Sequence, residues 1–279
     1  MILVFGKSGQ VATELARQTD VTALGSQECD LMQPGLATAA IRAHRPVSVI
    51  NAAAWTAVDG AQTDETGAFR LNHGAVAEMA ETCAELDIPF LHISTDYVFD
   101  GSGQAPWRED DTPSPLNIYG SSKLKGEEAV RASGVRHIIL RTSWVFSAHG
   151  ANFVKSMLRL SETRDHLNIV ADQIGGPTSA VDIARVLLSL NKALKGGFEA
   201  GLYHYSGAPD TSWAGFAREI FEQAGRDIQV SEIPSKDYPT PAKRPLNSRL
   251  DCSRIERDHG ISRPDWREGL SGIIKEIRA

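Results

Sequence analysis

The chain opens with Ile2-Leu3-Val4-Phe5-Gly6-Lys7-Ser8-Gly9-Gln10-Val11-Ala12, an apolar run followed by a turn of small residues. The spacing Gly6-x-x-Gly9-x-x-Ala12 falls between a predicted strand and a predicted helix, the context that a dinucleotide-binding turn requires. Gly6 would permit the tight turn, Gly9 would let the backbone approach a pyrophosphate, and Ala12 would allow the helix to pack closely on the strand. Free amides at the helix start attract phosphates. By itself this turn also fits an ordinary strand-to-helix connection.

Outward from this turn, short apolar runs alternate with helix-like segments through the first half of the chain. The expected strands cover residues 2–5, 21–24, 47–50, 90–93 and 136–140, and the expected helices cover about 10–18, 35–44, 64–86 and 117–133. This rhythm predicts an α/β fold, a Rossmann-type doubly wound parallel sheet with helices on both faces.

The rhythm loosens after residue 146. We expect a helix near 151–163, a strand at 167–170, a helix near 179–194, a strand at 202–205, and a Pro-richer tail with two more short helices. The predicted dinucleotide-binding core is therefore 1–146, with returning elements at about 165–206. The segments 147–164 and 207–279 are predicted to form a smaller C-terminal substrate-binding lobe. A long loop at about 99–116, rich in Gly and Pro, is of the kind that is often functional.

Composition narrows the classes of function. The chain has 279 residues, 42% of them hydrophobic and 23% charged, with a formal net charge of −6, so we expect no nucleic-acid partner. Its three cysteines are widely spaced, as in a reducing compartment. The first apolar run is too short for a signal peptide, and none approaches the length of a membrane span. We expect a cytoplasmic protein without a membrane partner.

Three further segments bear on the binding of a dinucleotide. The second strand ends in Ala23-Leu24-Gly25-Ser26, without the acid that usually bonds the ribose 2′-hydroxyl of NAD. This favours NADPH weakly, with Lys7 as a source of positive charge, and NADH stays open. Asp30-Leu31 could meet the adenine or be part of a solvated loop. Ala52-Ala53-Ala54, after the third strand, would let the cofactor lie flat.

The reaction centre is predicted from Tyr119 and Lys123, with Ser94-Thr95-Asp96 at the end of the fourth strand. Residues four apart on a helix share one face, so the Lys123 ammonium could lower the pKa of the Tyr119 phenol and make it a proton donor. A hydroxyl at the strand end could hold a substrate carbonyl against that phenol. The pair alone is also compatible with a solvated helix face.

Taken together, these motifs resemble the extended short-chain dehydrogenase/reductases, and within them the family of dTDP-4-dehydrorhamnose reductases. The resemblance covers nearly the whole chain and is carried by FGKSGQVATEL, VINAAAWTAVD, HISTDYVFDG, SPLNIYGSSKLKGE, LRTSWVFS, DQIGGPT, GLYHYSG and PAKRPLNSRLD. It implies NADPH-dependent reduction of the 4-keto group of dTDP-4-dehydro-β-L-rhamnose, giving dTDP-L-rhamnose.

The resemblance also assigns roles to residues. Tyr119 would protonate the ketone oxygen, Lys123 would bond the nicotinamide ribose, and Thr95 would bond the ketone. Asp96 and Trp144 would line the sugar site, although Trp144 could also be core. The dinucleotide would be contacted by Gly6, Lys7, Gly9, Gln10, Val11, Asp30, Leu31, Ala52, Ala53, Ala54, Tyr119 and Lys123.

Neighbouring functions differ in the residues that they need. Related 4,6-dehydratases carry Thr-Asp-Glu where this chain has Thr95-Asp96-Tyr97, and a phenol cannot do a carboxylate's work at neutral pH. Epimerisation is harder to exclude. The alternatives kept open are a reductase of another nucleotide-linked 4-keto-deoxysugar and a non-catalytic NADP-binding regulatory subunit like that of methionine adenosyltransferase.

The sequence gives little support for a Mg²⁺ site and does not fix the oligomeric state. Some reductases of this type form dimers around Mg²⁺ held by glutamates, and Glu14 occupies one corresponding position, whereas Asp182 and Glu268 lie one residue away from the others. We therefore doubt a Mg²⁺ site and expect a monomer or a homodimer. Asn72 is expected to be a satisfied polar residue, and Arg244 and Asn247 could serve either the pyrophosphate or lobe packing.

Overall fold

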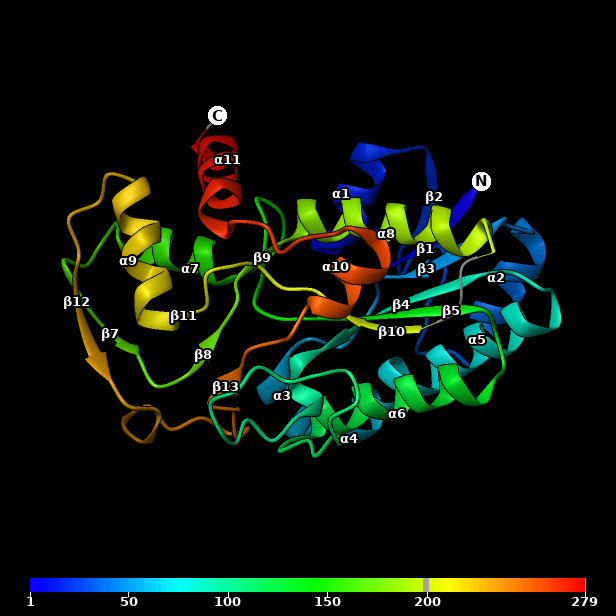
Figure 1. Cartoon of the computed structure of the whole chain (residues 1–279), viewed down its shortest axis with the longest axis horizontal. Helices are drawn as coiled ribbons and strands as arrows, with labels where there is room; N and C mark the ends of the chain where they lie inside the picture. Colours follow the sequence, from blue (N-terminus) through cyan, green and yellow to red (C-terminus); the bar gives the residue numbers. More distant parts are fainter. Residues whose placement is uncertain (198–200, 279) are drawn as a thin grey trace.

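The computed structural model describes residues 1–197 and 201–278. Figure 1 shows two parts, a large α/β core and a smaller lobe that contains the C-terminus. The core is built on a six-stranded sheet with the order β10-β5-β4-β3-β1-β2, and every pairing in it is parallel. Its strands are β1 (Ile2–Phe5), β2 (Val21–Leu24), β3 (Ser48–Asn51), β4 (Phe90–Thr95), β5 (His137–Thr142) and β10 (Gly201–His204).

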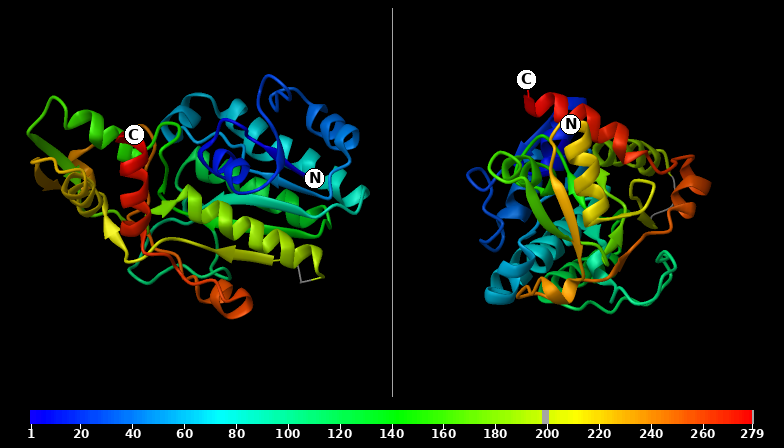
Figure 2. Two further views of the ribbon diagram at one scale, coloured as in Figure 1. Left: turned by 90° about the horizontal axis from the view of Figure 1, so that it is seen from above. Right: turned by 90° about the vertical axis from the view of Figure 1, so that its left-hand side faces the viewer.

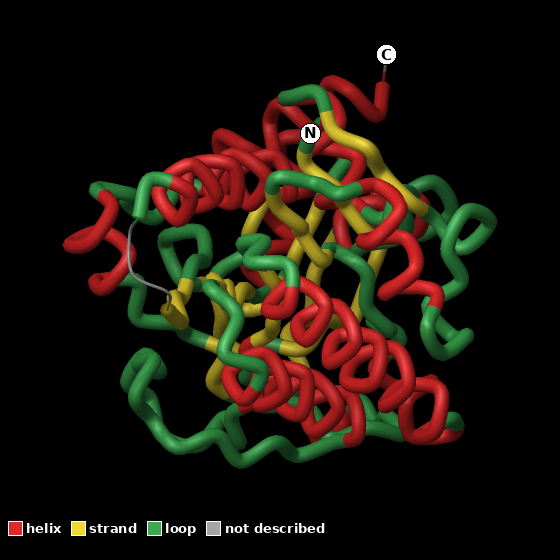
Figure 3. Tube along the Cα trace, turned by 90° about the vertical axis from the view of Figure 1, so that its right-hand side faces the viewer, coloured by secondary structure: helices red, strands yellow, loops and turns green. Residues whose placement is uncertain are grey.

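Helices cover both faces of this sheet, as Figure 3 shows from the end of the core. Alternate strand residues point to opposite faces, so Val4 and Leu3 belong to different hydrophobic clusters. One face packs against α1 (Gln10–Gln18) and α8 (Ala180–Lys195). The other packs against α2 (Leu36–His44), α5 (Ala75–Glu85) and α6 (Ile118–Ala132). The predicted doubly wound parallel sheet is confirmed.

The helix predicted over 64–86 consists of three pieces: α4 (Glu65–Phe69), a π-helical turn (Arg70–Gly74) and α5. A short α3 (Val58–Thr63), which was not predicted, precedes them. The predicted loop at 99–116 contains only a β-bridge from Trp107 to Leu250. Glycine lets α6 approach the end of β4 closely, because a Cβ on Gly120 would lie 2.1 Å from the Tyr97 carbonyl oxygen.

The smaller lobe has its own hydrophobic cluster, centred on Phe146, Phe216 and Trp266. Its helices lie at one end of the core in the left view of Figure 2, and the right view shows the molecule from that end. They are α7 (Phe153–Leu160), α9 (Trp213–Gln223) and α11 (Trp266–Arg278), and its main strands are β7 (His166–Val170) and β12 (Gln229–Ile233). Short strand pairs connect the lobe to the core: β6 (Val145–Phe146) with β9 (Thr178–Ser179), and β8 (Ile174–Gly175) with β11 (Thr211–Ser212) and β13 (Asn247–Ser248).

Three details differ from the expected division. β7 forms a two-stranded sheet with β12, so the chain returns to the core through α8 and β10 rather than from about residue 165. The described part of the tail has three helices instead of two, since α9 and α11 are joined by α10 (Ser253–His259). Ile255 of α10 packs in the cluster of the core, not of the lobe. We propose lobe boundaries at about 147–175 and 207–249, with α11.

Candidate active site

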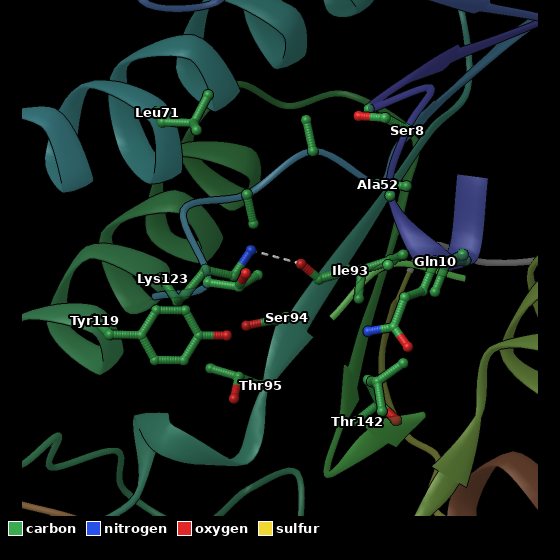
Figure 4. A pocket seen from close by; sticks show the side chains of 18 of the residues that line it. Ser8, Gln10, Ala52, Leu71, Ile93, Ser94, Thr95, Tyr119, Lys123 and Thr142 are labelled. Carbon is green, nitrogen blue, oxygen red and sulfur yellow. Dashed lines mark hydrogen bonds between the residues drawn. The ribbon is translucent and has the colours of Figure 1, made fainter. Parts of the chain in front are cut away.

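A large cavity of about 800 Å³ opens where the carboxyl ends of the core strands face the lobe. Doubly wound sheets bind ligands at this edge, and the volume is within the range of cofactor sites. Figure 4 shows side chains that line it, from the glycine turn at one end to Tyr119 at the other. The predicted site residues that line it are Gly6, Gly9, Gln10, Val11, Asp30, Leu31, Ala52, Ala53, Ala54, Thr95, Asp96, Tyr119, Lys123 and Trp144.

The glycine turn is shaped for a close backbone approach. Gly6 has φ +101°, and a Cβ there would lie 2.8 Å from the Ala53 nitrogen. Gly9 closes the turn by donating its N–H to the Gly6 carbonyl at 2.7 Å, and Ala12 is fully buried beneath it. The turn and the alanine segment after β3 therefore leave backbone-lined space at the start of α1, which fits the pyrophosphate of a dinucleotide.

Lys7 is the predicted site residue that does not line the cavity. Its ammonium is 2.5 Å from Glu28 Oε1, and its side chain is 55% exposed. The Glu28 carboxylate also accepts the Gly25 N–H at 3.0 Å, so the acid that closes this turn comes from four residues beyond the strand end. The Lys7 ammonium, which was expected to supply positive charge to the cofactor site, therefore pairs with a carboxylate in this structure.

Thr95 and Asp96 stand where β4 ends. The Thr95 hydroxyl accepts the Tyr97 N–H at 3.2 Å and donates to Asp96 Oδ1 at 3.0 Å, so both side chains are fixed. Asp96 is 3% exposed, and burial raises the pKa of its carboxyl to about 6, although hydrogen bonds from Ser248 and Thr95 oppose the rise.

Tyr119 lies in the first turn of α6, which is capped by Asn117: the Asn117 Oδ1 accepts the Gly120 N–H at 2.8 Å. The phenol points toward Thr95 in Figure 4, and the Tyr97 ring contacts it edge-on with centroids 5.5 Å apart. Burial raises the pKa of Tyr119 to about 12, while the hydrogen bond with Thr95 lowers it and Asp96 raises it.

Lys123 is not among the groups that shift the pKa of the Tyr119 phenol in this structure, so its effect on that phenol stays a prediction. The Lys123 side-chain nitrogen donates to the Ile93 carbonyl at 2.6 Å and lies 3.3 Å from His92 Nε2. Lys123 is 2% exposed, and burial lowers its own pKa to about 8, against the effect of Glu127.

Two indoles, those of Trp144 and Trp213, line the cavity. Trp144 has φ +50°, an uncommon conformation for a large side chain, and its ring stacks on Trp213 with centroids 3.7 Å apart. A Cβ on Gly175 would come within 2.8 Å of the Trp144 ring. Trp213 belongs to α9 of the lobe and donates its Nε1–H to Gln173 at 3.1 Å. Trp213 was not predicted from the sequence, where only its place just after the helix cap Ser212 singles it out.

Three weaker candidates lie outside the cavity lining. Asn72 is a satisfied polar residue, as expected: it bonds both backbone atoms of Trp55 and donates to Ser122 Oγ at 3.0 Å. Arg244 forms a bidentate pair with Asp59, at 2.7 and 3.0 Å. Asn247 donates to the Ala105 carbonyl at 2.8 Å. These contacts support the packing alternative for Arg244 and Asn247.

The doubtful Mg²⁺ position does not fit a metal. The buried Glu14 carboxylate is bonded to Arg17 at 3.3 Å and to His149 at 3.1 Å, and Arg17 also pairs with Glu276. Asp182 is held by the cap Ser179 and by Arg185. Within 1–197 and 201–278, no cluster of three or more His, Cys, Asp or Glu side chains could hold a metal ion.

The fold and this cavity define a short-chain dehydrogenase/reductase of the extended type. A family model described as the RmlD substrate binding domain matches residues 1–279. A dTDP-4-dehydrorhamnose reductase from Sinorhizobium fredii is 43% identical over 284 residues, which are 98% of this chain and 96% of that protein. The reductase of the same name from Escherichia coli K12 is 38% identical over 293 residues, covering 99% and 97%.

Solved structures agree with these relatives. A dTDP-4-dehydrorhamnose reductase from Bacillus anthracis, in complex with NADP, superposes with a TM-score of 0.94 at 30% identity, covering 99% of this chain and 98% of that chain. One from Clostridium acetobutylicum gives 0.94 at 34% identity, covering 100% and 99%. The chain belongs to the RmlD substrate binding domain family, in which these dTDP-4-dehydrorhamnose reductases are its relatives.

Proposed function

We propose that this protein reduces the 4-keto group of dTDP-4-dehydro-β-L-rhamnose to give dTDP-L-rhamnose, with NADPH as the reductant. The observation that carries the proposal is that Thr95, Tyr119 and Lys123 line the same cavity as the glycine turn. Relatives that match this chain over nearly their whole length are named for this activity, and one solved relative is in complex with NADP. NADH remains a second possible reductant.

When bound, the nicotinamide supplies the hydride that adds to C4 of the sugar. Tyr119 donates its phenolic proton to the ketone oxygen, so that the carbonyl becomes an alcohol and a phenolate is left. Thr95 hydrogen-bonds the ketone oxygen and fixes it against the phenol. Lys123 holds the nicotinamide ribose beside the phenolate.

The walls of the cavity place the two ligands. The glycine turn and Ala52, Ala53 and Ala54 hold the dinucleotide, with Gln10, Val11, Asp30 and Leu31 beside it. Asp96 and Trp144 line the hexulose site. Tyr97 occupies the position of a dehydratase acid, and burial raises the pKa of its phenol well above the usual value, so it does not supply a carboxylate's chemistry.

The test is the loss of NADPH absorbance with enzymatically generated dTDP-4-dehydro-L-rhamnose, with NADH and the UDP-linked sugar as comparisons. We expect rapid oxidation with the dTDP sugar. No oxidation by protein that binds NADPH would favour another 4-keto-deoxysugar or a regulatory subunit. One relative at 35% identity, a Bacillus subtilis spore coat polysaccharide biosynthesis protein, makes other sugars worth including.

Tyr119→Phe is the decisive variant for this mechanism. Because it removes only the proton donor, we expect kcat to fall by about 100-fold or more while NADPH affinity stays nearly unchanged. Lys123→Ala should weaken both, since one side chain serves the ribose and the phenol. A Tyr119→Phe enzyme that keeps most of its kcat would show that Tyr119 is not the donor.

The setting of the activity belongs to the same proposal. We place the protein in the cytoplasm, as a monomer or homodimer. Cys29, Cys83 and Cys252 are free and buried, as is usual in a reducing compartment. No helix among the described residues is long and apolar enough to cross a membrane.

A further inference from the structure

A chain of buried polar groups runs behind the cavity, from the cofactor platform to the catalytic lysine. The Ala53 N–H donates to Asn51 Oδ1 at 3.0 Å, and Asn51 Nδ2 lies 3.1 Å from His92 Nδ1. On the other side of the ring, His92 Nε2 lies 3.3 Å from Lys123 Nζ. Asn51, His92 and Lys123 are 1%, 0% and 2% exposed, so these contacts are buried from bulk solvent.

Donor and acceptor roles along this chain are fixed from one end. Because Asn51 Oδ1 is taken by the Ala53 N–H, the group that faces His92 Nδ1 is the amide NH₂, which can only donate. His92 Nδ1 must then accept. Burial holds the pKa of His92 well below its usual value, so the ring is neutral and carries its one proton on Nε2.

That proton points at Lys123. An ammonium has three donors and no acceptor, so a charged Lys123 would set a donor against the His92 Nε2–H. An uncharged amine has a lone pair that accepts from His92, and it still donates to the Ile93 carbonyl.

We propose that His92, oriented by Asn51, is a positioning residue that presents an N–H to Lys123 and thereby favours the uncharged amine. This inference rests on the proposed function, because it concerns how readily Lys123 exchanges a proton beside Tyr119. An amine balanced between its two forms can release a proton and take it back as the phenol turns over. The lining of the cavity does not reveal Asn51 and His92, since neither side chain touches it.

The other groups that face Lys123 act in the opposite direction or are neutral. Glu127, one turn along α6, favours the ammonium; it is held by both nitrogens of a fork from Arg141, at 2.6 and 2.8 Å, and by Ser94. Tyr119 on the same helix is neutral near pH 7. Glu127 therefore favours the charged form of Lys123, and the Asn51 amide, acting through His92 on β4, favours the uncharged form.

The test is the titration of Lys123 in ¹³C-lysine-labelled protein, followed by NMR at its Cε, with Lys123→Met to assign the resonance. In Asn51→Asp, one carboxylate oxygen still accepts from the Ala53 N–H. The other oxygen replaces the NH₂ group that faces His92 Nδ1, so an acceptor stands where a donor was. The imidazole proton then moves to Nδ1, and Nε2 accepts from the ammonium. We expect the midpoint of Lys123 to rise by about one pH unit or more.

Two further variants separate this effect from added charge. His92→Gln introduces no charge but offers an amide oxygen to the ammonium, so it should also raise the midpoint. Asn191→Asp is the matched control, a buried asparagine in α8 on the opposite face of the sheet, and should leave the midpoint unchanged. Folded Asn51→Asp and His92→Gln proteins with the wild-type midpoint would overturn the inference.

The same variants separate the inference from the function on which it rests. The alkaline limb of the pH profile of kcat/KM should move upward with the NMR midpoint. If the midpoint shifts in the variants but the wild-type protein does not reduce the keto sugar, the proposed function is refuted and the assignment of His92 is supported. Reduction of the sugar with an unmoved midpoint would do the reverse.

Discussion

Asp96 and Asp59 are carboxyls near one site whose pKa values shift in opposite directions, because the first is buried and the second is paired with an arginine. Burial raises the pKa of Asp96 to about 6. The hydrogen bond from Arg244 lowers the pKa of Asp59, which is 40% exposed. The first group binds its proton more tightly in the folded chain than in the unfolded chain, and the second binds it less tightly. Their contributions to stability therefore change with pH in opposite senses.

Asp96→Asn is expected to stabilise the protein at neutral pH. With a folded pKa near 6 against an unfolded value near 4, the Asp96 carboxyl destabilises the fold progressively as pH rises through this window, by about 3 kcal/mol at most. The variant lacks this penalty, so its advantage in free energy of unfolding should be largest above pH 7 and vanish below about pH 3. Urea unfolding at several pH values measures it.

Asp59→Asn serves as the control with the opposite sign. Its lowered pKa means that the stabilising contribution is present at neutral pH and is lost as pH falls below the unfolded value. The variant should therefore be less stable than wild type at pH 7 and equal to it in acid. Matching pH trends for the two variants would contradict the burial argument for Asp96.

Helical glycines give a prediction at the scale of elements. Gly120→Ala in α6 would push a methyl group to within 2.1 Å of the Tyr97 carbonyl oxygen, so we expect a loss of about 2 kcal/mol in unfolding free energy and a lower kcat. Gly272→Ala in α11 meets nothing within 4 Å and should gain about 0.5–1 kcal/mol. Thermal melts compare the two; equal shifts would mean that Tyr97 gives way.

Much of the core could be predicted element by element, because buried parallel strands are short apolar runs and the helices between them have a clear period. β1 and β2 match their predicted bounds, and β3 begins one residue later than expected. Periodicity does not show which other strand a given strand pairs with. β7 has the pattern of a core strand, yet its five residues pair with β12, about sixty residues further along the chain.

The site was predictable to the extent that its residues lie on the core. The glycine turn and the Tyr119–Lys123 pair follow from spacing on elements whose strand ends must meet at one edge. Trp213 reaches the cavity from the lobe, and its position depends on how α9 packs beside Trp144. Lys7 lies outside the cavity lining and pairs with the Glu28 carboxylate from the loop beyond β2, a contact that spacing in the sequence does not show.

At the scale of the whole molecule, the cavity lies between the two parts. Gln10 of α1 accepts a hydrogen bond from Asn152 at 3.1 Å, and residues 150–152 of the loop 147–152 line the cavity. We expect NADPH at a hundred times its Kd to add about 2.7 kcal/mol to the free energy of unfolding and to slow hydrogen exchange in this loop. Protection confined to the glycine turn would mean that the lobe does not take part in binding.

The strand order β2-β1-β3-β4-β5-β10 also bears on how the chain assembles as it is synthesised. β1 leaves the ribosome first and becomes an interior strand, β2 joins one side of it and β3 the other, and β4, β5 and β10 each join the free edge left by the core strand before them. No strand of this sheet has to wait for a partner that is still to be translated. Growth of the sheet can therefore keep pace with translation, and the last strand, β10, completes the sheet after about two hundred residues have emerged.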